Sequence, residues 1–228
     1  MNTAIIVAAG KSQRFGCTVS KQFFPLLGKP LIIHTLEQFE SCPVVDAIVI
    51  VLSDAGREEF SKLTDTSPFN KIKAVVSGGE TRAESVAKGL AAIDLTTAGV
   101  VAVHDGARPL VTVEEITRTI EKAIETGAAC LVADVTDTIK EVTGNKIVRT
   151  IDRRSLRRAL TPQAFRYDVL RRAFDNIDLD GSITDECSLV ERLGVEIAVV
   201  EGSGRNIKVT RAEDVVFAEA ILRDRHFS

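Results

Sequence analysis

The sequence has 228 residues, 45% of them apolar and 27% charged, and its formal net charge is −3. Nucleic-acid binders normally carry a basic excess, which is missing here. No stretch approaches the roughly 18 consecutive apolar residues of a membrane span. The four cysteines are far apart and form no CxxC pair, which argues against a zinc site or a disulfide framework. We therefore expect a soluble cytoplasmic protein that binds neither nucleic acid nor membrane.

Short aliphatic runs alternate with helical patterns along most of the chain. The runs predict strands at residues 4–8, 47–52, 74–76, 100–103, 130–133 and 195–200. Helical spacing predicts helices from residue 30 and over 57–63, 82–93, 166–174 and 185–193. Two capping-box patterns, Thr112-x-x-Glu115 and Thr210-x-x-Glu213, predict further helices from Thr112 to about 126 and from Thr210 onward. This alternation predicts an α/β fold, with a Rossmann-like, mostly parallel sheet and helices on both faces.

One segment interrupts the alternation. Residues 138–142 and 146–151 are two β-prone runs on either side of Gly144-Asn145, which is a hairpin signal. We expect this hairpin to project from the core as an arm over about residues 136–156. No repeat or linker divides the rest, so residues 1–228 are predicted to form a single domain.

The loop after the first strand is the first candidate site, because ligands of open α/β sheets bind beyond the carboxyl ends of the strands. Ala8, Ala9 and Gly10 are small and let backbone N–H groups approach a phosphate. The loop matches neither a Walker A loop nor GxGxxG. Arg14 and Lys21 add two cations to it, which favours a phosphate-binding loop over an ordinary surface turn.

Polar groups also follow later strands. Gly78-Gly79 precedes a helix and lets the backbone lie against a ligand, although an ordinary turn would look the same. Asp105 ends a strand and is a candidate Mg²⁺ ligand, and Arg108 suits a bidentate phosphate contact. His104 is predicted to be structural, since phosphate chemistry here needs no imidazole. Further polar groups stand at the ends of elements around Thr161, Thr184 and Lys208.

Ten ordered segments together resemble one family, the 2-C-methyl-D-erythritol 4-phosphate cytidylyltransferases of the non-mevalonate isoprenoid pathway. The segments span residues 4–214 and read AAGKSQRFG, KQF, GKPLIIHT, SGGETRAESVAKGL, VHDGARPLV, DTIK, DRRSL, LTPQAF, ITDECSLVE and NIKVT. The resemblance implies a single nucleotidyltransferase domain that transfers the cytidylyl group from CTP to methylerythritol phosphate. It further implies a homodimer and dependence on Mg²⁺ or another divalent cation.

The resemblance also assigns roles to residues. Cytosine and ribose would be held by Ala8, Ala9, Gly10, Gly79, Glu80 and Ser85. The catalytic cations would be Arg14, Lys21 and Lys208. Asp105 would bind the metal or the acceptor hydroxyls. The acceptor would also contact Arg108, Thr161 and Thr184 of the same subunit and Thr138 and Arg153 from the arm of the partner subunit.

Some positions depart from the family pattern, and other functions stay open. Ser12, Phe15 and Ser20 stand where the family usually has glycine, methionine and proline, which can change the flexibility of the loop. The nearest alternative is a cytidylyltransferase for another polyol phosphate such as ribitol 5-phosphate. A sugar-phosphate nucleotidyltransferase that uses another triphosphate is a wider alternative. A non-catalytic nucleotide-binding regulator is a third, and the retained cations count against it.

Overall fold

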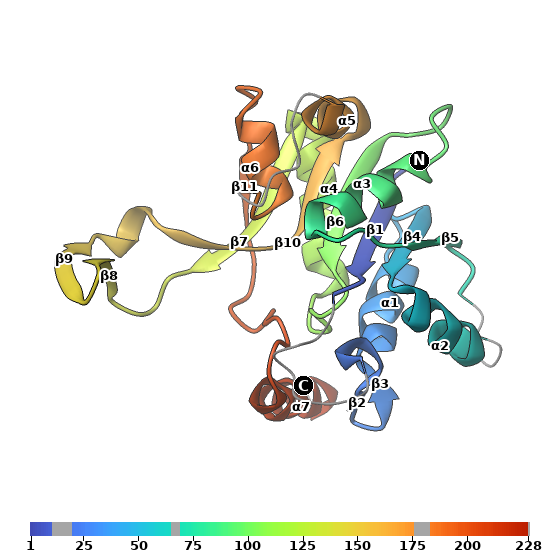
Figure 1. The fold of residues 1–228 in the computed structure, drawn as a ribbon, viewed down its shortest axis with the longest axis horizontal. Coiled ribbons are helices and arrows are strands. Elements are labelled where there is room, and N and C mark those ends of the chain that lie inside the picture. The colour runs from blue at the N-terminus through green and yellow to red at the C-terminus, as the bar shows by residue number, and fades with distance from the viewer. Residues whose placement is uncertain (11–19, 65–68, 176–182, 228) are drawn as a thin grey trace.

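A seven-stranded sheet forms the centre of the protein in a computed structural model that describes residues 1–10, 20–64, 69–175 and 183–227 (Figure 1). The strands are β1 (Thr3–Ala8), β4 (Ala47–Leu52), β5 (Ile72–Ser77), β6 (Val100–Asp105), β7 (Ala128–Asp134), β10 (Arg157–Arg166) and β11 (Ala198–Glu201). Their order is β11-β7-β10-β6-β1-β4-β5. All pair in parallel except β10, which is antiparallel to both neighbours. The predicted mostly parallel sheet is confirmed.

Helices cover both faces of the sheet, as predicted. They are α1 (Leu31–Ser41), α2 (Asp54–Thr64), α3 (Arg82–Ala91), α4 (Val113–Thr126), α5 (Tyr167–Asp175), α6 (Glu186–Glu191) and α7 (Ala212–Phe227). Successive side chains of a strand point to opposite faces. Ala4 and Ile6 of β1 therefore pack in one buried cluster with α1 and α4, while Ile5 packs in a second with α3, α5 and α6. Among the described residues, no helix is long and apolar enough to span a bilayer.

The strand β10 is the element that the sequence pattern did not predict. We read residues 161–163 as a polar site at an element end, whereas they lie inside a strand between β6 and β7. Leu160, Ala164 and Phe165 are buried there. Pro162 obscured the strand, because proline donates no ladder hydrogen bond and is rare in central strands. The register shifts between Ala159 and Gln163, so Pro162 lies in the irregular part of the pairing with β7.

The two predicted helix starts differ in outcome. Thr112 and Glu115 form the expected capping box at the start of α4. At α7 the expected partner of Thr210 was Glu213, which is wrong. Asp214 Oδ2 instead accepts hydrogen bonds from the backbone N–H groups of Thr210 and Arg211, at 2.7 and 2.8 Å. A carboxylate near a helix start satisfies the backbone donors from several positions, which spacing alone does not distinguish.

The predicted hairpin is present and extends away from the sheet (Figure 1). It consists of β8 (Ile139–Thr143) and β9 (Lys146–Ile151), which form a separate two-stranded sheet, followed by the 3₁₀ turn η3 (Arg153–Ser155). Its large apolar side chains Val142, Ile147 and Val148 are between 57% and 66% exposed. A two-stranded hairpin is marginal on its own in water, so this surface needs a packing partner.

Candidate active site

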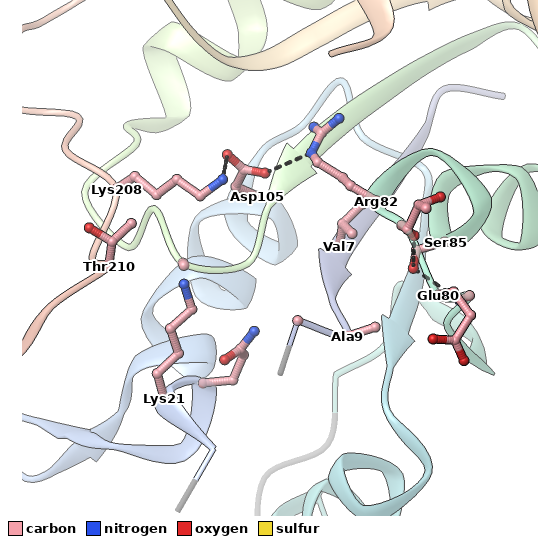
Figure 2. Close-up of a pocket in the computed structure, with 14 residues that line it drawn as sticks. Val7, Ala9, Lys21, Glu80, Arg82, Ser85, Asp105, Lys208 and Thr210 are labelled. Atoms are coloured by element: carbon pink, nitrogen blue, oxygen red, sulfur yellow. Dashed lines mark hydrogen bonds and ion pairs between the residues drawn. The ribbon is translucent and has the colours of Figure 1, made fainter. Parts of the chain in front are cut away.

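A pocket of about 450 Å³ lies beyond the carboxyl ends of β1, β5 and β6, the edge at which the sequence predicted ligand binding (Figure 2). Residues far apart in the sequence line it together. They are Val7, Ala9, Gly10, Lys21, Gln22, Gly79, Glu80, Thr81, Arg82, Ser85, Asp105, Ala107, Lys208 and Thr210. The volume falls within the range of small-molecule sites. Eight of the predicted site residues therefore share one cavity: Ala9, Gly10, Lys21, Gly79, Glu80, Ser85, Asp105 and Lys208.

The first wall of the pocket comes from the end of β1 and the short 3₁₀ turn η2 (Lys21–Phe23). The buried Gln22 donates from Nε2 to the carbonyl of Ala8 at 2.8 Å and so ties the turn to the strand. Ala8 itself is outside the pocket lining. This hydrogen bond positions η2 so that Lys21 points into the pocket, where its Nζ lies 3.2 Å from the carbonyl of Val209 (Figure 2).

The second wall is the turn between β5 and α3. The backbone of Gly78 passes so close to Ala9 that a Cβ at position 78 would lie 2.3 Å from the Ala9 Cβ. Ser85 holds the turn, since its hydroxyl accepts from the Gly79 N–H at 3.0 Å and donates to the Thr81 carbonyl at 2.9 Å. The two glycines thus allow the turn to lie against β1 and present its backbone to the pocket.

The third wall is a cluster of charges around Asp105 at the end of β6. Its Oδ1 lies 3.2 Å from Arg82 Nε, and its Oδ2 lies 2.9 Å from Lys208 Nζ and 3.3 Å from Arg108 Nε. Burial opposes ionisation of Asp105, but the charges of Arg82, Lys208 and Arg108 outweigh it and hold its pKa well below the usual range. Asp105 is therefore a carboxylate that gathers three cations, and two of them, Arg82 and Lys208, line the pocket with it (Figure 2).

The sequence pattern does not single out Arg82, which reads as the first residue of an amphipathic helix. Its guanidinium bridges Asp105 and Glu186, with Nη1 2.5 Å from Glu186 Oε1. Burial alone would lower the pKa of Arg82, but the two carboxylates raise it above the ordinary value. Glu186 is fully buried, and burial raises its pKa. The position of Arg82 three residues after Gly79, at the ligand-binding edge, was the signal available in the sequence.

The donor set around Asp105 does not fit a metal held by the protein alone. Mg²⁺ in proteins is octahedral and takes oxygen ligands from carboxylates, water and substrate phosphates. Both oxygens of Asp105 already face cationic groups, and the described part of the chain contains no cluster of three or more Asp, Glu, His or Cys side chains. The arrangement suits an anion instead, because three cations face two carboxylates, Asp105 and Glu186.

The Asp105→Asn variant tests what the carboxylate does. We expect kcat/KM for the acceptor to fall about tenfold, since Arg82, Arg108 and Lys208 lose the charge that orients them. The dependence of the rate on Mg²⁺ concentration should keep its midpoint. Steady-state rates measured over a Mg²⁺ titration, for the variant and the unmodified protein, check both statements. A midpoint displaced to higher Mg²⁺ would make Asp105 a metal ligand, as the sequence suggested.

The other predicted residues lie outside the pocket lining. Arg108 is adjacent to it, paired with Asp105, and Thr161 is 4% exposed with its hydroxyl bonded inside the protein. Thr184 is exposed just before α6. Thr138 and Arg153 are exposed at the base of the arm, where Arg153 donates to the carbonyl of Thr136. Arg14, Ser12 and Phe15 lie outside the described residues.

Comparisons with known proteins agree with this geometry. The profile of the family described as IspD, 2-C-methyl-D-erythritol 4-phosphate cytidylyltransferase, matches residues 2–224. The protein of that name from Bacillus velezensis is 44% identical over 221 residues, which cover 96% of this chain and 94% of the relative. The one from Geobacillus kaustophilus is 42% identical, with 97% of each chain covered. The crystal structure of the Francisella tularensis protein superposes with a TM-score of 0.80 at 34% identity and covers 96% of this chain and 98% of its own. The chain belongs to the 2-C-methyl-D-erythritol 4-phosphate cytidylyltransferase family.

Proposed function

We propose that this protein transfers the cytidylyl group from CTP to 2-C-methyl-D-erythritol 4-phosphate, giving 4-diphosphocytidyl-2-C-methyl-D-erythritol and pyrophosphate for isoprenoid precursor biosynthesis. Family membership gives the reaction. The observation that supports this reaction for the present chain is the pocket. Its small residues after β1 and β5 face the cations around Asp105. Such a pocket has a backbone side for a base and ribose and a charged side for phosphates.

The nucleotide is proposed to lie along the first two walls. Ala9, Gly10 and Gly79 offer backbone with little side-chain bulk, and Ala8 and Ser85 hold that backbone in place. Glu80 borders the same wall. A cytosine and its ribose hydroxyls meet hydrogen-bonding groups at fixed positions there, and a purine would need more room.

The acceptor is proposed to lie on the charged side of the pocket. Asp105 would accept from its hydroxyl groups, and Arg108, which pairs with Asp105, and the exposed Thr184 are proposed to contact it as well. Thr138 and Arg153 are proposed to reach it from the arm of a partner subunit, in a homodimer formed by the single domain of residues 1–228. The exposed apolar side chains of the arm support this, because a dimer would bury them.

The chemistry needs no general base from the protein. The second pKa of a phosphate monoester is about 6, so the acceptor phosphate is mostly a dianion at pH 7. One of its oxygens attacks the α-phosphorus of CTP in line. A new P–O bond forms as the bond to the β-phosphate breaks, and pyrophosphate leaves with the electron pair. The difficulty is repulsion between two anions, so catalysis is positioning and charge neutralisation.

Lys21 and Lys208 are proposed as the catalytic cations among the described residues. They line the pocket from different elements, and Lys208 is held through Asp105 while Lys21 is held through η2. Arg14 is proposed to join them from the loop that follows β1. A divalent cation, Mg²⁺ or another, is proposed to arrive with the triphosphate as part of the substrate.

We also propose that the protein is cytoplasmic and binds neither nucleic acid nor membrane. The three described cysteines, Cys42, Cys130 and Cys187, are free and buried, which suits a reducing compartment such as the cytoplasm. The −3 net charge gives no support to nucleic-acid binding, and no described helix supports a membrane location.

A substrate panel tests the reaction. The purified protein is incubated with Mg²⁺, one nucleoside triphosphate and one polyol phosphate, and pyrophosphate release is measured. We expect kcat/KM with CTP to exceed that with ATP or GTP at least about tenfold, because the backbone and short polar groups around Ala9, Gly79 and Ser85 are proposed to match a pyrimidine better than a larger purine. Methylerythritol phosphate should be the best acceptor. Equal use of ATP would argue for a broader nucleotidyltransferase, and a preference for ribitol 5-phosphate would reassign the acceptor.

A further inference from the structure

The buried His104 is assigned no role in the reaction above, yet it lies directly beneath the charged wall of the pocket. Its side chain is 0% exposed and packs against Phe39, with ring centroids 4.9 Å apart. It does not line the pocket, so it cannot exchange a proton with a substrate bound there. Burial lowers its pKa to about 3, so the ring is neutral at neutral pH. A neutral imidazole has one N–H and one acceptor nitrogen, and its neighbours decide which is which.

Three hydrogen bonds define the tautomer. His104 Nε2 lies 3.2 Å from the carbonyl of Arg108, which can only accept, so Nε2 carries the proton. Nδ1 is then an acceptor, 3.0 Å from the Thr161 hydroxyl. That hydroxyl also receives the backbone N–H of Asp105 at 3.1 Å. The chain therefore runs from the Asp105 N–H through Thr161 and His104 to the Arg108 carbonyl, with every donor and acceptor matched.

This series of hydrogen bonds connects both ends of the turn that carries Asp105 and Arg108. The network also includes the segment that carries Lys208, because Asn206 Nδ2 donates to the Thr161 carbonyl at 3.0 Å. The Asn206 carbonyl in turn accepts from Arg108 Nη1 at 2.9 Å. Asn206 is 1% exposed and lies two residues before Lys208. Strand β6, strand β10 and the segment with Lys208 are thus tied together under the cations.

We propose that His104, as the Nε2–H tautomer, is a positioning residue that acts with Thr161 to fix the Asp105–Arg108 turn and thereby the cations of the acceptor site. The proposal rests on the proposed function of the pocket. It changes the role expected for Thr161. The only hydroxyl proton of Thr161 is used on His104, so Thr161 acts through its neighbours and not by donating to the acceptor.

A spectroscopic measurement tests the tautomer without any assay of activity. The protein has three histidines, so its ring nitrogens are resolvable in a long-range ¹H–¹⁵N correlation spectrum of the ¹⁵N-labelled protein. We expect the His104 ring, identified by its loss in His104→Gln, to have a protonated Nε2 and an unprotonated Nδ1; His34, whose Nε2 lies 2.8 Å from the Leu26 carbonyl, should give a second ring of the same tautomer. Thr161→Val should shift the Nδ1 resonance of the His104 ring. An Nδ1–H tautomer, or a resonance that Thr161→Val leaves unmoved, would overturn the proposal even if the reaction is confirmed.

Kinetics test the positioning role. Thr161→Val keeps the volume but removes the hydroxyl, and we expect kcat/KM for the acceptor to fall about tenfold while the KM for CTP changes less than about threefold. Thr161→Ser should restore most of the loss. The matched control is Thr119→Val, another buried threonine, whose hydroxyl donates within α4 to the Glu115 carbonyl at 2.7 Å. It should leave both constants unchanged.

A double variant separates positioning from direct contact. His104→Gln retains a donor for the Arg108 carbonyl but removes the Nδ1 acceptor. If the two residues act through one hydrogen bond, adding Thr161→Val to His104→Gln should lower activity by no more than about threefold further. Losses that multiply would mean that Thr161 contacts the substrate independently and would refute the proposal. Should His104→Gln fail to fold, His34→Gln and His226→Gln identify the other two rings, and the remaining ring gives the tautomer of His104.

Discussion

The Lys21→Ala variant is expected to lose about a hundredfold in kcat with little change in melting temperature. Lys21 lines the pocket from η2, a short turn fixed to β1 by the Gln22–Ala8 hydrogen bond. In the proposed reaction its ammonium is therefore held where negative charge would grow on the α-phosphate and the leaving pyrophosphate. A group that acts mainly in the transition state lowers kcat when removed, whereas a ground-state contact raises KM.

The matched control is Lys29→Ala. Lys29 pairs with Glu37 at 2.7 Å, lies outside the pocket lining, and has a half-exposed side chain. Its removal should leave kcat within about twofold, since an exposed ion pair contributes little. Steady-state kinetics with CTP and acceptor varied separately, together with thermal melts, check both variants. A Lys21→Ala protein with a raised KM and normal kcat would make Lys21 a ground-state contact, and a large drop in melting temperature would make it structural.

The strands and helices were predictable wherever apolar residues recur at the spacing of a strand or a helix. Buried aliphatic runs located β1, β4 and β6, and the Thr112–Glu115 pattern located the start of α4. Position at the carboxyl ends of the strands was enough to place Lys21, Gly79 and Asp105 at one site before any geometry was known. These features are local, because a strand or a cap is determined by a few neighbouring residues.

The parts that the sequence did not predict depend on contacts between distant segments. β10 is stabilised as a strand by β6 and β7, while Pro162 makes its own pattern unlike a strand. Arg82 looked like an ordinary helix residue until Asp105 and Glu186 were found on either side of its guanidinium. The resemblance assigns Thr161 to the substrate site, but nothing in the sequence pairs its hydroxyl with His104 Nδ1, 57 residues away and 3.0 Å distant. Long-range hydrogen bonds of this kind leave no periodic signal in the sequence.

The second large effect is expected from a substitution in the arm. We expect Arg153→Ala to abolish most activity, although Arg153 lies on η3 at the base of a hairpin that extends away from the sheet (Figure 1). The reason is the proposed dimer, in which each arm delivers Arg153 to the site of the other subunit. The exposed Val142, Ile147 and Val148 would be covered by the same contact. Arg154→Ala is the matched control, because Arg154 is the adjacent arginine and pairs with Asp152 at 2.6 Å; it should keep near-normal activity.

A mixing experiment decides whether Arg153 acts in its own subunit or in the partner. Lys21→Ala and Arg153→Ala proteins, each nearly inactive, are unfolded, mixed in equal amounts and refolded. If Arg153 acts on the partner's site, one site of each mixed dimer carries both lesions and the other carries none. Random pairing makes about half of the dimers mixed, so about a quarter of the normal activity should return. If Arg153 acts in its own subunit, every site keeps one lesion and no activity returns. Native mass spectrometry verifies that mixed dimers have formed, so an inactive mixture that contains them would refute delivery across the dimer.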